Sequence, residues 1–141
     1  MFASPDVGGI KRARSFAKFF DAELAVCDKY RKEANRIDSM RLIGEVEGMD
    51  VVLVDDLIDT AGTICKAAAL LKEKGAKTVR AVCTHPVLSG NAYENIENSD
   101  LIEVAVSDTI PLKQVTSKIK VLSVSTLYAK KKKKMHDNES I

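Results

Sequence analysis

The chain has 141 residues, of which 45% are hydrophobic and 30% charged, with a formal net charge of +2. This is the composition of one globular domain, and no apolar run approaches the roughly 20 residues that span a membrane. Residues 130–134 are all lysine, so the 22 basic residues less these five leave 17 against 20 acidic ones. Bulk charge therefore gives no indication of nucleic-acid binding, and we expect neither nucleic acid nor a membrane as partner.

Three cysteines, Cys27, Cys65 and Cys83, lie in apolar segments without the spacing of a metal site. Such an odd number favours buried, reduced thiols and predicts a cytoplasmic protein. The first residues show no basic region followed by an apolar stretch, so we expect no signal peptide.

The chain begins with the end of a short strand at 1–3, and a turn and a helix follow. The turn, Ser4-Pro5-Asp6-Val7-Gly8-Gly9, contains residues that favour tight turns. Apolar residues then recur at helical spacing and form one face, at Ala13, Phe16, Ala17 and Phe20. We expect the cations of this helix to point mostly elsewhere, namely Lys11, Arg12 and Arg14.

A second strand is expected at 24–27, and the polar stretch that follows it carries four cations within residues 29–36. A solvated surface turn is the usual meaning of such a run. The alternative is a mobile loop that closes its cations over a phosphoryl-transfer centre.

Two further strands, 40–46 and 51–54, are expected to be neighbours joined across residues 48–50. The second consists of Val51-Val52-Leu53-Val54, which is typical of a parallel strand buried on both faces. Three carboxylates follow within five positions, and the small-residue turn at 59–63 leads into a helix predicted over 64–71. Gly75 lies where a left-handed residue is expected to end that helix.

A strand, a small-residue turn and a helix start together have the parts of a phosphate site. Unpaired backbone N–H groups and the positive end of the helix dipole converge at residues 59–63. Asp55 and Asp56 come at the carboxyl end of the strand, where open α/β sheets bind ligands. Because carboxylates repel phosphate, these two could accept hydrogen bonds from sugar hydroxyls or hold Mg²⁺.

The remainder of the chain continues the alternation of strands and helices. Strands are predicted at 79–83, 102–106 and 119–124, with a short polar helix or turn at 91–98 and a last helix beginning within 124–128. The lysine run should be solvated, so residues 130–141 are expected to form a frayed basic tail.

Residues 51–63, in this order, resemble the phosphoribosyl-pyrophosphate motif of the type I phosphoribosyltransferase fold, and more narrowly that of the ribose-phosphate diphosphokinases, or PRPP synthetases. Residues 4–9 and the stretch Thr84-His85-Pro86-Val87-Leu88-Ser89-Gly90 are also similar to that family. The resemblance covers the second half of the family pattern. It implies a single α/β domain over 1–141, with three layers and a mainly parallel sheet flanked by helices.

The same resemblance implies roles for individual residues. Asp55 and Asp56 would bind the ribose of ribose 5-phosphate, and its phosphate would lie on Asp59, Thr60, Ala61, Gly62 and Thr63. Asp6 would be a ligand of Mg²⁺, although an aspartate in such a loop usually hydrogen-bonds its own turn. Lys29 and Arg31 would be catalytic cations on a mobile loop, with Tyr30 between them as a departure from the usual family pattern. His85 would line the site.

The implied reaction transfers diphosphate from ATP to ribose 5-phosphate and gives PRPP and AMP, in nucleotide biosynthesis. In the family the first half supplies the adenine pocket, so we expect this chain to bind ATP only with that half, in a homo-oligomer or with a partner, and to be inactive alone. Two alternatives stay open. One is a non-catalytic subunit that keeps the fold, and the other is a phosphoribosyltransferase that consumes PRPP.

Overall fold

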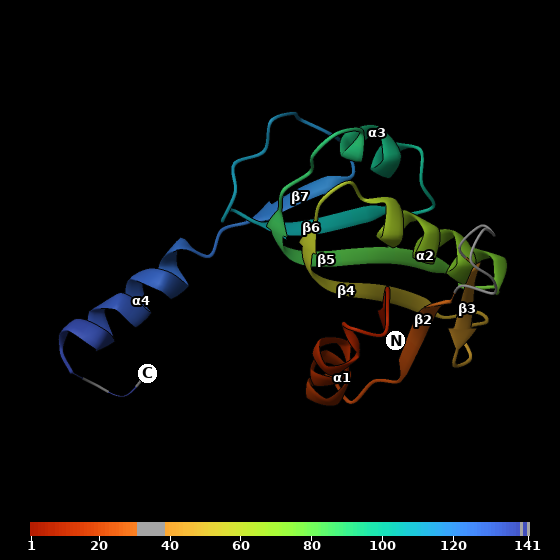
Figure 1. The fold of residues 1–141 in the computed structure, drawn as a ribbon. Coiled ribbons are helices and arrows are strands. Elements are labelled where there is room, and N and C mark those ends of the chain that lie inside the picture. Colours follow the sequence, from red (N-terminus) through yellow and green to blue (C-terminus); the bar gives the residue numbers. More distant parts are fainter. Residues whose placement is uncertain (31–38, 139, 141) are drawn as a thin grey trace.

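The computed structural model describes residues 1–30, 39–138 and 140, and these form a seven-stranded sheet with four helices (Figure 1). The strands are β1 (Phe2–Ser4), β2 (Leu24–Tyr30), β3 (Ser39–Ile43), β4 (Asp50–Ile58), β5 (Thr78–Pro86), β6 (Glu103–Ser107) and β7 (Ile119–Leu122). The helices are α1 (Ile10–Phe19), α2 (Gly62–Glu73), α3 (Ala92–Glu97) and α4 (Ser125–His136).

The sheet has the order β3-β2-β1-β4-β5-β6-β7, and its pairings are parallel except for the antiparallel pair β2–β3. Helix α1 lies on one face, against β1, β2 and β4, whereas α2 and α3 lie on the other (Figure 1). The predicted α/β fold, with a mainly parallel sheet and helices on both faces, is confirmed.

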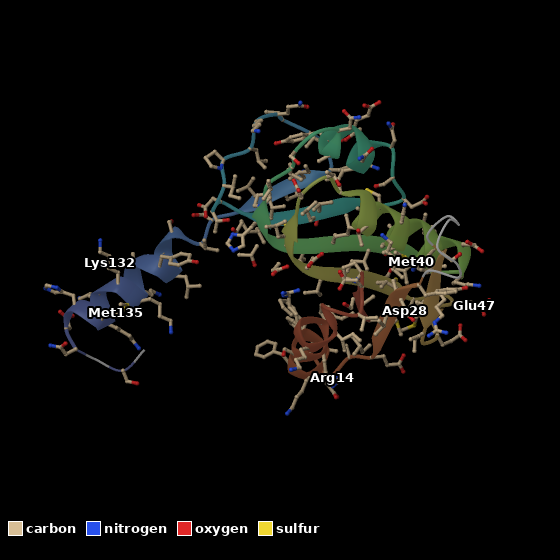
Figure 2. All side chains as sticks on the ribbon, viewed as in Figure 1. Arg14, Asp28, Met40, Glu47, Lys132 and Met135 are labelled. Atoms are coloured by element: carbon tan, nitrogen blue, oxygen red, sulfur yellow. The ribbon has the colours of Figure 1, made fainter. Side chains whose placement is uncertain are left out.

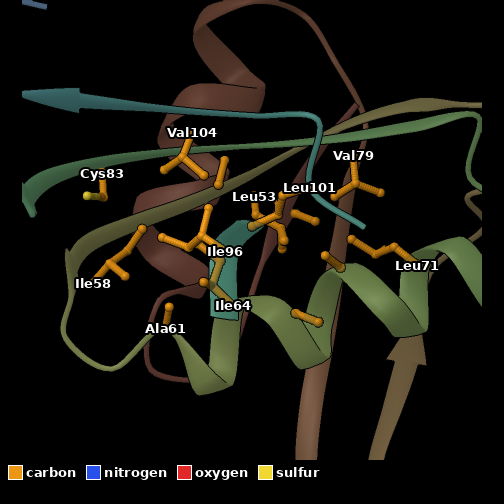
Figure 3. Close-up of a cluster of buried hydrophobic side chains, with 14 of the residues drawn as sticks. Leu53, Ile58, Ala61, Ile64, Leu71, Val79, Cys83, Ile96, Leu101 and Val104 are labelled. Carbon is orange, nitrogen blue, oxygen red and sulfur yellow. The ribbon is translucent and has the colours of Figure 1, made fainter. Parts of the chain in front are cut away.

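The core is centred on β4, as its apolar sequence predicts. Val51, Leu53 and Val54 are fully buried, because neighbouring strands and both helix layers cover this part of the sheet. Helix α2 contributes buried side chains at the spacing of one helix face, namely Ile64, Ala67, Ala68 and Leu71. Figure 3 shows side chains of β4, α2 and α3 meeting in this cluster.

The expected pairing of strands 40–46 and 51–54 is wrong. Strand β3 lies at the edge of the sheet and pairs with β2. The strand that pairs with β4 on this side is β1, with Phe2 opposite Val52 and Ala3 opposite Leu53. The sequence gives no sign of this because β1 is only three residues long and lies about 50 residues from its partner.

Strand β4 also continues further than expected. Asp55, Leu57 and Ile58 still pair with β5, opposite Cys83, His85 and Pro86. The pairing of β1 with β4 ends at Leu53, and that of β6 with β5 ends at Cys83, opposite Asp55. Strands β4 and β5 therefore project beyond their neighbours after Asp55, and both aspartates lie within β4 and not after it.

Helix α4 leaves the sheet and extends away from it (Figure 1), and none of its residues is buried. The basic tail expected to fray from residue 130 is instead helical as far as His136, because lysine is a good helix former. Lys132 and Met135 both project into solvent (Figure 2). Among the described residues no helix combines the length and apolar character needed to cross a bilayer.

Candidate functional site

A pocket of about 310 Å³ lies at the projecting end of β4, and its lining consists of Asp6 and the continuous run 55–64. Three carboxylates come from the turn before α1 and from the end of β4. The small-residue turn that precedes α2 forms a further part of the lining. The structure thus brings together the predicted metal ligand and the seven residues predicted to bind ribose 5-phosphate, which are Asp55, Asp56, Asp59, Thr60, Ala61, Gly62 and Thr63.

The turn before α2 has an uncommon backbone conformation. Ala61, its N-cap residue, is left-handed, with φ 65° and ψ 5°, and this costs a residue other than glycine about 1–2 kcal/mol. No side chain caps the helix, and its first turn contains no acidic residue. The N–H groups at the start of α2 are thus not taken by a side-chain cap, as an anion site requires.

Two side chains from outside the turn brace it. Ser89 donates one hydrogen bond from Oγ to the Asp59 carboxylate and another from its N–H to the Asp59 carbonyl, at 3.0 Å. Asn95 Nδ2 donates to the Thr60 carbonyl at 2.9 Å. The resemblance over residues 84–90 included Ser89, whereas nothing in the sequence indicated Asn95.

An arginine from α1 joins the carboxylates. Arg12 Nη2 lies 2.9 Å from Asp56 Oδ2, and Arg12 Nη1 lies 3.4 Å from Asp55 Oδ1. The sequence indicated only that Arg12 lies off the apolar face of its helix, and it did not predict this contact with the carboxylates. The physical reason is that α1 packs against β1 and β4 with its first turn near the end of β4, more than 40 residues away in sequence.

The two neighbouring carboxylates differ in acidity. Burial raises the pKa of Asp55 to about 6, and the adjacent Asp6 and Asp56 charges add to this rise, which the hydrogen bond from the Asp56 N–H opposes. Desolvation also acts to raise the pKa of Asp56, but its hydrogen bond with Asp55 and the charge of Arg12 outweigh it, so the pKa of Asp56 is lowered. Asp55 therefore keeps its proton to a higher pH than Asp56 does.

The position of Asp6 is compatible with both roles considered for it, a hydrogen bond within its own turn and a ligand of Mg²⁺. Its Oδ1 accepts a hydrogen bond from the Gly9 N–H at 2.8 Å, which closes its own turn, and its side chain also lines the pocket. Among the described residues, no group of three or more His, Cys, Asp or Glu side chains is arranged to hold a metal ion by itself. Mg²⁺ is commonly held by one or two carboxylates with water and substrate oxygens, so Asp6 and Asp55 fit a magnesium ion shared with substrate.

The predicted catalytic cations are placed differently. Lys29 lies in β2, opposite Met40 of β3, so the expectation that it belongs to a mobile loop is wrong. Pairing with β3 extends β2 to Tyr30. Lys29 lines a second cavity of about 150 Å³, beside Thr60, Gly62 and Thr63 of the turn. Arg31 lies outside the described residues.

His85 does not line the main pocket. Its Nδ1 lies 2.9 Å from Thr109 Oγ1, on the side of β5 that faces the segment after β6. The histidine therefore links two strand ends, and the prediction that it lines the site is wrong.

Known proteins similar to this chain match it over nearly all of its length. Residues 31–141 match the family described as phosphoribosyl synthetase-associated domain. The ribose-phosphate pyrophosphokinase of Wolinella succinogenes is 54% identical over 141 residues, which are 100% of this chain and 46% of the relative. That of Campylobacter jejuni is 52% identical with the same coverage. The chain thus spans about half the length of the curated relatives it matches.

Solved structures give the same result. The phosphoribosylpyrophosphate synthetase from Mycobacterium smegmatis has a TM-score of 0.89 and 35% identity, over 97% of this chain and 45% of that one. The orotate phosphoribosyltransferase from Aeropyrum pernix, with a TM-score of 0.58 and 19% identity over 93% of this chain and 64% of that one, shares the fold alone. The chain belongs to the phosphoribosyl synthetase-associated domain family and corresponds to the C-terminal portion of the ribose-phosphate pyrophosphokinases, with a type I phosphoribosyltransferase fold.

Proposed function

We propose that the pocket at the end of β4 binds ribose 5-phosphate. The observation that carries this proposal is the division of one pocket into an acidic part and an uncapped helix start. Asp55 and Asp56 would accept hydrogen bonds from the sugar hydroxyls, and the turn at 59–63 would hold the phosphate on backbone N–H groups. Ser89 and Asn95 support this assignment, since their hydrogen bonds hold the turn in place without a ligand.

Asp6, together with Asp55, would hold Mg²⁺ in the same pocket. When bound, the ion would offset negative charge on the phosphoryl groups. Asp55 is well placed for either role because its raised pKa reflects burial and crowding by the other carboxylates, and a cation relieves that crowding.

The activity that we propose for the complete enzyme is transfer of diphosphate from ATP to the anomeric hydroxyl of ribose 5-phosphate, giving PRPP and AMP. This chain would orient the sugar, and Lys29 and Arg31 would stabilise charge that develops on the transferred group. The proximity of Lys29 to the turn supports this role, because both line one cavity. ATP binding would need the remainder of the enzyme, in a homo-oligomer or as a partner polypeptide, since the chain spans 46% of its relatives.

A phosphoribosyltransferase that consumes PRPP is less well supported. Three solved enzymes of that kind have 19–22% identity to this chain and TM-scores of 0.52–0.58, against 35% and 0.89 for the synthetase. No structural feature of the described residues favours the non-catalytic subunit either.

Calorimetric titration with ribose 5-phosphate tests the binding site. A Cβ added at Gly62 would lie 3.7 Å from Thr60 Oγ1, an ordinary contact, so Gly62→Ala should fold normally. Gly62→Val adds two further methyl groups at the same position, and its folding is checked by urea unfolding. Both side chains would occupy space needed by the phosphate, and we expect affinity to fall progressively from glycine to alanine to valine. Equal affinity in all three proteins would contradict the site. AMP release, measured with and without a polypeptide equivalent to the rest of a relative, would test the reaction.

A further inference from the structure

Arg12 occupies a position that the helix itself does not favour. Helix α1 begins at Ile10 after the N-cap Gly9, so Arg12 lies in its first turn, where the dipole disfavours cations and no acidic residue is present. The favourable interactions of Arg12 are those with the carboxylates of β4. Its position is thus explained by the pocket and not by helix stability.

The guanidinium joins two side chains that a strand would separate. Successive residues of a strand point to opposite faces, so Asp55 and Asp56 have no intrinsic reason to present their carboxylates together. Arg12 contacts them with different nitrogen atoms, Nη1 at 3.4 Å from Asp55 and Nη2 at 2.9 Å from Asp56. The side chain of Asp56 is 59% exposed, against 20% for Asp55, so the arginine restrains the more exposed of the two.

The turn before α1 fixes the arginine relative to Asp6 as well. The Gly9 N–H donates to Asp6 Oδ1 at 2.8 Å, and the Ser4 hydroxyl donates to the Asp6 carbonyl at 2.6 Å. A Cβ at Gly9 would lie only 2.7 Å from Ser4 Oγ, so the close start of α1 requires glycine. One rigid turn therefore sets the positions of Asp6 and Arg12 together.

We propose that Arg12 is a positioning residue for the sugar part of the site: it holds Asp55 and Asp56 in the arrangement that accepts the ribose hydroxyls. The inference rests on the proposed function. It predicts that Arg12 controls affinity for the sugar and leaves affinity for the phosphate alone unchanged. A residue that merely offset the acidic charge of the pocket would affect both.

Calorimetric titrations of the chain with ribose 5-phosphate and with inorganic phosphate test this. Arg12→Gln removes the charge and the fork of donors, whereas Arg12→Lys keeps the charge on a single nitrogen. Arg14→Gln is the matched control, because Arg14 lies exposed on the same helix and points away from the sheet (Figure 2). We expect both Arg12 variants to bind ribose 5-phosphate about tenfold more weakly, with inorganic phosphate affinity within about twofold of wild type. The control should match wild type with both probes.

Three results would contradict this proposal. Unchanged ribose 5-phosphate affinity in Arg12→Gln, an equal loss for both probes, or wild-type behaviour of Arg12→Lys would overturn the positioning role. If Arg12→Gln fails to fold, the comparison of Arg12→Lys with wild type decides the question in the same way. Absence of ribose 5-phosphate binding by the wild-type chain would overturn the proposed function, and this inference with it.

Discussion

Replacing Asp55 by asparagine should stabilise the ligand-free protein at neutral pH, although it removes a residue of the proposed site. Burial, with the Asp6 and Asp56 charges nearby, raises the pKa of Asp55 from its ordinary 3.8 to about 6. The folded chain therefore holds this proton more tightly than the unfolded chain does. The contribution of Asp55 to stability is greatest below about pH 4, falls as the pH rises toward 6, and stays reduced above that. Asparagine has the shape of the protonated carboxyl group and cannot ionise.

The size of the effect follows from the pKa. At about 1.4 kcal/mol per pH unit, a rise from 3.8 to about 6 corresponds to roughly 3 kcal/mol. The Asp55 side chain is 20% exposed and Arg12 lies 3.4 Å away, so solvent and that cation reduce the figure, and about 1–2 kcal/mol remains. The asparagine carbonyl oxygen can still accept the hydrogen bonds from Arg12 and from the Asp56 N–H.

Urea unfolding at pH 7.5 and at pH 4 measures this effect. Asp55→Asn should raise the free energy of unfolding by about 1–2 kcal/mol at pH 7.5 and by much less at pH 4. Asp100→Asn, at an exposed carboxylate, serves as the control and should change little at either pH. A variant that is no more stable than wild type at pH 7.5, or is stabilised equally at both pH values, would refute the reasoning. The affinity of Asp55→Asn for ribose 5-phosphate should also be lower than that of wild type.

Three further predictions concern the turn before α1, the cation and Lys29. Gly9→Ala should lower the free energy of unfolding, measured in urea, by about 1–3 kcal/mol, because its Cβ would lie 2.7 Å from Ser4 Oγ. Gly62→Ala is the control, and equal stability of the two variants would show that the contact between residue 9 and Ser4 is not tight. Mg²⁺ at about ten times its dissociation constant should stabilise the wild-type chain by about 1.4 kcal/mol, and an undiminished effect in Asp6→Asn would exclude Asp6 as a ligand. Lys29→Ala in the complete enzyme should lower kcat by about 10²–10³ with little change in KM for ribose 5-phosphate, and a steady-state loss of less than about threefold would contradict a catalytic role.

The sequence alone determined the central unit of the site. The buried run at 51–54, the turn at 59–63 and the following helix are adjacent in the chain, so hydrophobic pattern and local turn chemistry are sufficient to predict them. Gly75 is left-handed after α2, with φ 93°, as its position indicated. The turn at 59–63 and the two aspartates that precede it are therefore identifiable from the order of residues.

Tertiary structure decided which distant residues meet this unit. Arg12 reaches Asp55 and Asp56 across more than 40 residues, and Asn95 reaches Thr60 across 35. Strand β1, and not β3, lies beside β4. Because β2 pairs with β3, Lys29 lies in a strand and not in the loop predicted for it. These contacts depend on sheet order and helix packing. Propensity and spacing act over a few residues, so they contain no information about sheet order. Only the folded chain shows that Arg12 joins the two carboxylates.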